Sequence, residues 1–142
     1  MQKQAWPALR ALIVVGEALV AIDLADMLTD LGHVVVATEN RIDRALALVE
    51  AGGVDVAIVD IRVRGQLSFA FARRLQHSGV RVIFASSCGS RALIEGFRDF
   101  PVLRKPFFAE ALAAVLTKTC GDGAARSLFA KQWNHMRQPG IG

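Results

Sequence analysis

Hydrophobic and polar positions follow two different periods along this chain. Three short runs are almost continuously apolar and rich in Val and Ile: Arg10–Val15, Val54–Asp60 and Val80–Ala85. Runs of this length and composition are typical of strands that are buried on both faces of a parallel sheet. Two further strands are predicted over His33–Thr38 and Val102–Leu103.

Between the strands, apolar residues recur at the spacing of an α-helix. Helices are predicted over Ala18–Leu31, Asp43–Ala51, Ser68–His77, Ser90–Phe97 and Phe108–Thr119. In the first helix the apolar stripe comprises Leu19, Ile22, Leu24, Ala25, Leu28 and Leu31. A loop is expected after Asp60, and Ser68 is expected to cap the helix that follows it. Strand and helix alternate five times, which favours a parallel sheet with helices on both faces, a three-layer α/β/α sandwich.

One domain accounts for most of the 142 residues, of which 53% are hydrophobic. We expect a lead-in over residues 1–9, the α/β domain over residues 10–120 and a tail over residues 121–142 that could include a helix. No apolar stretch reaches the length of a membrane helix, so a cytoplasmic location is expected. Cys88 and Cys120 lie far apart, which favours reduced thiols, and Cys88 is interpreted as a small, partly buried side chain.

The charge of the chain gives little support to a nucleic-acid partner. The formal net charge is +4, but Lys and Arg are scattered singly or in pairs. The tail is also too short for a helix-turn-helix domain. No metal-ligand spacing relates the three histidines, which are interpreted as surface or turn residues: His33, His77 and His135.

Chemically active side chains gather at the predicted carboxyl edge of the sheet, where open α/β sheets collect their ligands. Asp60, Ser86 and Lys105 each lie at the end of a different strand, and Glu17 follows the first strand. A carboxylate, a hydroxyl and an ammonium are what phosphoryl transfer onto an aspartate requires. They supply the nucleophile, a donor to a phosphoryl oxygen and a cation that offsets charge in the transition state.

The motifs LIVVGEALV, VDVAIVD, VIFASS and LRKPF resemble, in order and spacing, the receiver domains of two-component response regulators. The resemblance implies a flavodoxin-like (βα)5 fold with a five-stranded parallel sheet in the order 2-1-3-4-5. It implies Asp60 as the phosphoacceptor, Ser86 as the hydroxyl that moves toward the phosphoryl group and Lys105 as the cation. The stretches around Ser86 and Lys105 also resemble a subgroup of single-domain receivers with a Phe-Ala-Thr-Gly motif.

The chain departs from the receiver pattern at the first strand end. Receivers usually place two adjacent acidic residues there to hold Mg²⁺, and this chain has Val15 and Gly16 instead. Asp60 and Glu17 remain as candidate ligands, although Glu17 is equally well explained as a first-turn residue favoured by the helix dipole. We therefore expect a weak or absent Mg²⁺ site and weakened phosphorylation.

Two arginines stand close behind the predicted phosphoacceptor. Arg62 could form a charge-assisted pair with Asp60 and take part of the place of the missing ion, although a solvated arginine is the simpler interpretation. Arg64 stands where receivers often carry proline. Val102 stands where receivers often carry an aromatic switch residue, so a switch of that kind is not expected.

Three functional hypotheses follow. The leading one is a stand-alone, atypical receiver that relays or modulates two-component signalling through protein contacts. The second is a conventional Mg²⁺-dependent receiver in which Glu17 rescues metal binding. The third is an α/β enzyme or nucleotide-binding domain that shares only the architecture; no GxxxxGK[ST], GxGxxG or Ser-His-Asp arrangement supports it.

The resemblance also implies partners and a working surface. A sensor histidine kinase or a phosphotransfer protein would supply the phosphoryl group, and the chain would be a signalling module rather than an enzyme. Receivers commonly bind targets or form homodimers through helix four, strand five and helix five, here residues 90–119. Phe107 and Phe108 would contribute to that surface or to the core.

Overall fold

The computed structural model describes residues 8–86 and 100–120. Its main sheet has five parallel strands in the order β2-β1-β3-β6-β7. These strands are β1 (Arg10–Val14), β2 (Val34–Glu39), β3 (Val56–Asp60), β6 (Arg81–Ser86) and β7 (Val102–Arg104). Because a short hairpin takes the labels β4 and β5, this is the predicted order 2-1-3-4-5, and the flavodoxin-like architecture is confirmed.

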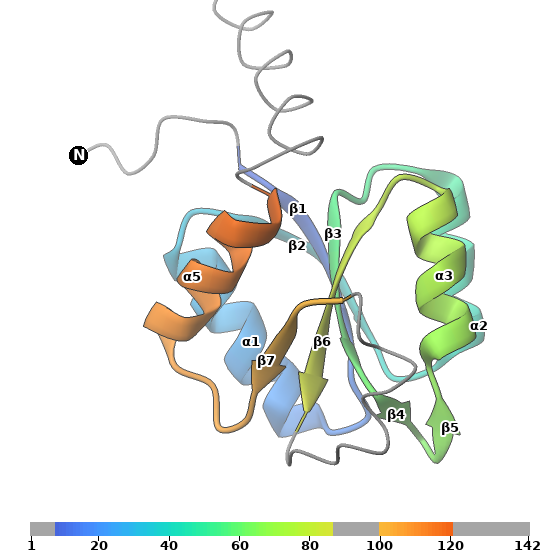
Figure 1. The fold of residues 1–142 in the computed structure, drawn as a ribbon, viewed down its shortest axis with the longest axis horizontal. Helices are drawn as coiled ribbons and strands as arrows, with labels where there is room; N and C mark the ends of the chain where they lie inside the picture. Colours follow the sequence, from blue (N-terminus) through green and yellow to red (C-terminus); the bar gives the residue numbers. More distant parts are fainter. Residues whose placement is uncertain (1–7, 87–99, 121–142) are drawn as a thin grey trace, which may run out of the picture.

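Helices cover both faces of the sheet, as predicted. They are α1 (Ala18–Asp30), α2 (Ile42–Ala51), α3 (Phe69–His77) and α5 (Ala109–Cys120). Helices α1 and α5 lie on one face, and α2 and α3 lie on the other (Figure 1). The predicted helix over residues 90–97 lies outside the described residues. Within the described ranges, no helix is both long and apolar enough to cross a membrane.

The alternation of side chains along β3 decides where its last residue points. Val56 and Ile58 belong to the core cluster under α1 and α5, whereas Ala57 and Val59 belong to the cluster under α2 and α3. Successive side chains of a strand point to opposite faces, so Asp60 continues the series of Val56 and Ile58. Its carboxylate is therefore directed toward the side of the sheet that carries α1 and α5.

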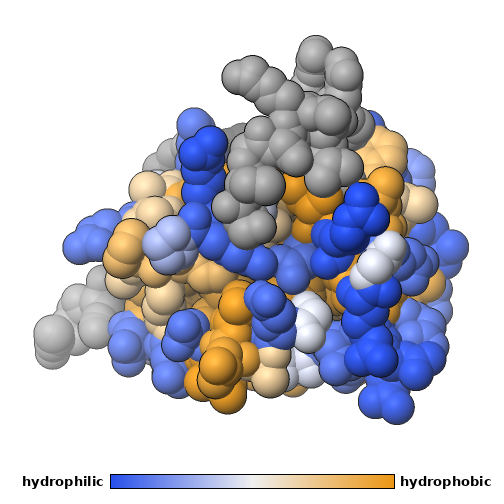
Figure 2. All heavy atoms as spheres, turned by 90° about the horizontal axis from the view of Figure 1, so that it is seen from below, coloured by the Kyte–Doolittle hydropathy of each residue, from blue (hydrophilic) through white to orange (hydrophobic). Residues whose placement is uncertain are grey.

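The predicted apolar stripe of α1 is wrong at two positions. Leu24 and Leu28 are fully buried, but Leu19 is 77% exposed and Ile22 is 54% exposed. At 100° per residue, Leu19 and Ile22 lie about 140° and about 160° around the helix from Leu24, so they cannot reach the sheet with it. Figure 2 shows apolar surface at the end of the molecule where α1 begins.

The loop expected after Asp60 contains a β-hairpin. Strands β4 (Arg62–Val63) and β5 (Gln66–Leu67) pair antiparallel, and Arg64 and Gly65 form the turn with φ of 51° and 82°. A two-residue turn with positive φ at both positions is the type that fits the twist of a hairpin. The sequence did not reveal it, because arginine seldom adopts positive φ and its strands are only two residues long.

Two titratable side chains lie in the fold away from the carboxyl edge. His33 is half-buried rather than simply a surface residue, and its Nδ1 accepts a hydrogen bond from the backbone N–H of Leu9 at 3.1 Å. Burial lowers the pKa of His33. Cys120 is a buried free thiol in the core under α5, where burial raises its pKa to about 11.

Candidate functional site

Asp60 ends the central strand of the sheet, and its backbone is held firmly. It pairs with Ala85 of β6, and its side chain is only 10% exposed. The hydroxyl of Ser68, which is fully buried, donates to the carbonyl oxygen of Asp60 at 2.6 Å and lies 3.0 Å from the carbonyl oxygen of Ile61. The backbone at the end of β3 is thus held in place by the Ser68 hydroxyl.

This contact corrects the expectation for Ser68. The residue does precede α3, but its hydroxyl makes no capping hydrogen bond to the helix. A serine hydroxyl can bond neighbouring backbone groups in several ways, and here the buried carbonyl groups of the strand end are the nearer partners. A serine ahead of a helix looks the same in either role, so its bond to the strand end could not be predicted from the sequence.

The carboxylate of Asp60 is held between a cation and a backbone amide. Lys105 Nζ lies 3.1 Å from Oδ1, and the N–H of Gly16 donates to Oδ2 at 3.3 Å. The contact with Lys105 lacks hydrogen-bond geometry, so it is an ion pair. A carboxylate with so little exposure needs such a partner, because removing an unpaired charge from water is very costly.

Lys105 is itself positioned by the sheet. It follows β7 directly, its backbone N–H donates to the carbonyl oxygen of Ser86 at 2.8 Å, and its peptide bond to Pro106 is cis. Its side chain is 19% exposed. Nζ also lies 3.9 Å from Oε1 of Glu17, whose side chain is 70% exposed. Lys105 therefore lies between two carboxylates, one buried and one in solvent.

Ser86 is the last residue of β6 and is half-buried at the same edge. It pairs with Arg104 of β7, next to Lys105 in the chain. The sheet thus brings Asp60, Ser86 and Lys105 to one edge from three neighbouring strands, as the sequence indicated, and places Glu17 beside Lys105. The sequence does not indicate the role of the amide of Gly16, because the receiver pattern marks this position only as that of a missing metal ligand.

The residues at this edge fit a divalent ion poorly. Within the described ranges, no group of three or more His, Cys, Asp or Glu side chains could hold a metal ion. The side chain of Val15 is buried and has no ligating atom, Asp60 is already paired with Lys105, and Glu17 is largely in solvent. A small octahedral ion is usually bound by one or two carboxylates that are free to approach it.

The absence of a side chain at position 16 is not forced by lack of room. A Cβ built on Gly16 would meet Arg64 N at 3.6 Å, an ordinary van der Waals contact. Its backbone does not have a positive φ. A side chain at this position would therefore meet no clash at its Cβ, and the backbone of the first loop does not require glycine here.

Arg62 is not the partner of Asp60. Its side chain is exposed, and Nη1 donates to the carbonyl oxygen of Gly65 at 3.4 Å, within the hairpin. The cation beside Asp60 is Lys105. Seen from the carboxyl edge of the sheet, strongly hydrophilic side chains gather on the side of the molecule that holds the hairpin (Figure 2).

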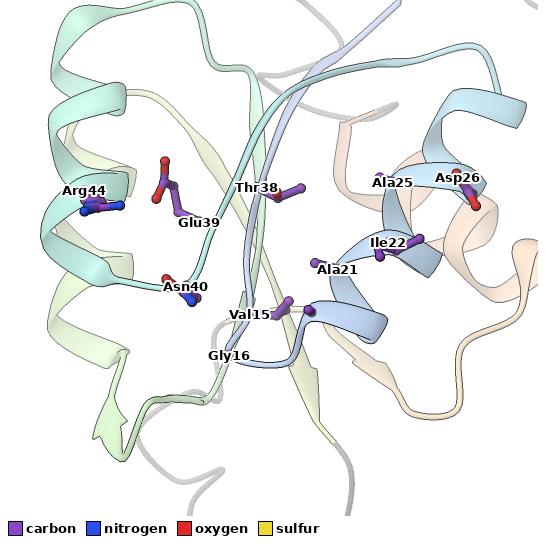
Figure 3. A pocket seen from close by; sticks show the side chains of 11 residues that line it. Val15, Gly16, Ala21, Ile22, Ala25, Asp26, Thr38, Glu39, Asn40 and Arg44 are labelled. Atoms are coloured by element: carbon purple, nitrogen blue, oxygen red, sulfur yellow. The ribbon is translucent and has the colours of Figure 1, made fainter.

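A hollow of about 670 Å³ lies next to this edge, between α1 and the end of β2 (Figure 3). Small and apolar side chains of α1 form one wall, and Thr38, Glu39 and Asn40 form the other. Val15 and Gly16 lie at one end of it, which connects the hollow to the first loop of the site.

Several proteins of known structure are similar to this chain in sequence and fold. The solution structure of SdrG from Sphingomonas melonis Fr1 is 36% identical, with a TM-score of 0.70, over 80% of this chain and 96% of that chain. The BeF3-activated conformation of SdrG from Pseudomonas melonis Fr1 is 38% identical, with a TM-score of 0.70, over 78% of this chain and 95% of that chain.

Two further structures are more distant. The signal receiver domain of a modulated diguanylate cyclase from Desulfovibrio desulfuricans G20 is 25% identical, with a TM-score of 0.73, and the match covers 80% of this chain and 94% of that domain. The anti-anti-sigma factor PhyR from Bartonella quintana is 25% identical, with a TM-score of 0.68, over 89% of this chain and 49% of PhyR. No protein-family model and no curated protein matched the chain.

Fold, site and relatives agree on the class of protein. A parallel sheet in this order, with an aspartate and a lysine paired at its carboxyl edge, is the arrangement that the receiver resemblance implies. The chain belongs to the response regulator receiver domain family.

Proposed function

We propose that this receiver relays or modulates two-component signalling through protein contacts, with Asp60 as a phosphoacceptor whose phosphorylation depends only weakly on Mg²⁺. The observation that carries the proposal is the contrast within one site. A nearly buried carboxylate is paired with Lys105 at 3.1 Å, whereas Val15 and Gly16 occupy the positions of the metal-binding acidic pair.

The proposed reaction is a simple displacement. An oxygen of the Asp60 carboxylate forms a bond to phosphorus, while the bond from phosphorus to the leaving atom of the donor breaks and the donor keeps the electron pair. Lys105 offsets the negative charge on the phosphoryl oxygens, and the hydroxyl of Ser86 donates to one of them. The donor would be a phosphohistidine of a sensor kinase or phosphotransfer protein, or a small acyl phosphate.

The structure of a relative supports this chemistry. SdrG, which is 38% identical to this chain, has been solved in a BeF3-activated conformation. Beryllofluoride mimics a phosphoryl group, so that relative responds to a phosphoryl-like ligand. We infer the same response for this chain at Asp60.

Glu17 supports a second version of the same function. Its Oε1 lies 3.9 Å from Lys105 Nζ, so its carboxylate is near the site although it is mostly in solvent. If Glu17 and Asp60 together held Mg²⁺, the ion would supply charge stabilisation and the protein would be a conventional receiver. The two versions differ in how strongly phosphorylation depends on Mg²⁺.

Partners are proposed by analogy with the family. PhyR, one of the relatives, is an anti-anti-sigma factor, which favours action through protein contacts rather than enzymatic activity. On this chain, Phe108 at the start of α5 is exposed, whereas Phe107 packs against the core. We expect residues 90–119 to bind a target or a second copy of the chain.

Intact-mass spectrometry tests the proposal directly. The protein is incubated with acetyl phosphate with and without Mg²⁺, beside an Asp60→Asn variant. The expected result is a gain of one phosphate that Mg²⁺ changes little and that the variant lacks. No gain under either condition would overturn Asp60 as a phosphoacceptor, and a gain only with Mg²⁺ would favour the conventional receiver with Glu17.

A further inference from the structure

The β4–β5 hairpin lies directly against the altered first loop of the site. Arg64 N is 3.6 Å from where a Cβ of Gly16 would be, and the N–H of Gly16 donates to Oδ2 of Asp60 at 3.3 Å. The backbone of the hairpin turn therefore lies close to Gly16, near enough that a Cβ added there would be in van der Waals contact with it. Figure 1 shows the hairpin at the same end of the molecule as the carboxyl ends of the strands.

The two arginines of the hairpin are engaged differently. Arg62 donates to the carbonyl oxygen of Gly65 and so stabilises the turn. Arg64 is exposed, and among the residues that the structure describes its guanidinium has no hydrogen bond or ion pair. Its backbone has a φ of 51°, in the left-handed region that non-glycine residues seldom adopt. The fold thus places at the turn an arginine whose guanidinium makes no hydrogen bond or ion pair with the described part of the chain.

The site has fewer positive charges than a phosphorylated Asp60 would need, and an arginine could supply one. Asp60 and Glu17 are negative, and Lys105 is the one cation within 4 Å of either among the described residues. A phosphoryl group adds about two negative charges. Where the acidic pair is present, a metal ion can offset that charge, but these residues fit a metal poorly. A guanidinium binds phosphoryl oxygens through two parallel hydrogen bonds.

We propose that Arg64 binds the phosphoryl group on Asp60 and supplies the positive charge that a metal ion provides in typical receivers. This inference rests on the proposed function, because it needs Asp60 to carry a phosphoryl group. In this proposal the hairpin turn holds Arg64 next to the phosphoryl group, on the side of the site where Val15 and Gly16 replace the acidic pair. Arg62 acts as a positioning residue, since it fixes the turn that carries Arg64.

Beryllofluoride in magnesium-free buffer is the probe for this role. Its binding to Asp60 is followed by NMR through the backbone amide of Gly16, in the wild type and in an Arg64→Asn variant. Asparagine tolerates the left-handed conformation, so the variant removes the charge and keeps the turn. Arg74→Gln is the matched control, because Arg74 is an exposed arginine of α3 that pairs with Glu50.

We expect Arg64→Asn to weaken beryllofluoride binding about tenfold, the size of a lost charge-assisted hydrogen bond. Arg64→Lys should keep part of the affinity, and Arg74→Gln should leave it unchanged. Equal affinity of Arg64→Asn and wild type would overturn the role of Arg64 while leaving Asp60 as the acceptor. Failure of the wild type to bind beryllofluoride, with or without Mg²⁺, would instead overturn the proposed function and this inference with it.

Discussion

The two loops that flank Asp60 differ in what they retain of a phosphorylation site. On the side of β6 and β7, Lys105 pairs with the carboxylate, and its amide is tied to Ser86 at 2.8 Å. On the side of β1, Val15 and Gly16 contribute only a backbone N–H, and the nearest acidic side chain, Glu17, is mostly in solvent.

This difference separates two requirements of phosphoryl transfer. The nucleophile and its cation need a rigid, partly desolvated pocket, which the centre of the sheet provides. In typical receivers the metal is held by carboxylates at two adjacent loop positions. This chain has the receiver fold with Val15 and Gly16 there, and Gly16 has room for a Cβ. The ion pair between Asp60 and Lys105 therefore forms in this fold without an acidic residue at position 15 or 16.

Removal of the cation should have the largest effect. In Lys105→Met, the charge on the transferred phosphoryl group loses its main offset, and we expect the rate of phosphate incorporation from acetyl phosphate to fall by about 10²-fold. The rate is measured by intact mass over time. Lys118→Met, which removes an exposed lysine of α5, is the matched control. Similar rates in both variants would mean that Lys105 is not the cation of the reaction.

An acidic residue restored in the first loop should strengthen Mg²⁺ binding at the site. Gly16→Asp places a carboxylate beside Asp60 in the space that a Cβ can occupy. We expect Mg²⁺ affinity, measured by titration calorimetry, to increase by about tenfold or more, since each added carboxylate strengthens a hard-cation site. Gly16→Ala adds the Cβ without the charge.

The alanine variant decides how the result is interpreted. If Gly16→Ala increased Mg²⁺ affinity as much as Gly16→Asp, the gain would come from loop geometry rather than from the carboxylate. If neither variant bound Mg²⁺ more tightly than the wild type, the missing acidic residue would not be the reason for weak metal binding.

Ser68 is expected to matter for stability. Ser68→Ala removes the hydroxyl that donates to the carbonyl oxygen of Asp60 in a fully buried position. We expect the free energy of unfolding to fall by about 1–2 kcal/mol in urea denaturation, because a buried acceptor loses its donor. Ser78→Ala, at an exposed helix end, should change it by less. Equal losses in both would show that the bond to Asp60 contributes little.

The parallel sheet and the meeting of Asp60, Ser86 and Lys105 at one edge could be predicted from strong, local signals, whereas the strand order came from the resemblance to receiver domains. Apolar runs rich in β-branched residues are typical of buried parallel strands. Asp60 and Ser86 end two such runs, and Lys105 follows the short strand β7. Once the strands are parallel and adjacent, their ends must meet at one edge. No side-chain detail was needed for that conclusion.

The features that the sequence did not predict depend on contacts between segments or on rare backbone conformations. The hairpin after Asp60 relies on Arg64 at a φ of 51°. The buried hydroxyl of Ser68 bonds a strand end that lies eight positions back in the sequence. The outward position of Leu19 and Ile22 depends on which side of α1 the sheet covers, and an apolar stripe this broad leaves that open.

The smallest expected effect is that of His33 on stability. His33 lies at the amino edge of the sheet, opposite the site, so it also tests whether the site depends on that edge. Burial lowers the pKa of His33 below 6.5 in the folded state. Well above pH 6.5, His33 is neutral in both the folded and the unfolded chain, so its titration does not change the free energy of unfolding. Below pH 6.5, His33 is protonated in the unfolded chain but stays neutral in the folded protein. The free energy of unfolding should therefore decrease as the pH falls toward the pKa of folded His33.

Variants of two histidines measure this contribution. His33→Gln keeps an acceptor for the N–H of Leu9 but cannot titrate, so the decrease in unfolding free energy between pH 7 and pH 5 should be smaller than in wild type. His77→Gln, at an exposed position in α3, is the control. Because Leu9 and His33 lie at the amino end of β1, phosphorylation of Asp60 at pH 7 should be the same in His33→Gln and wild type. A changed phosphorylation rate would show that the two edges are coupled through β1, and the acceptor would then depend on more than its own pocket.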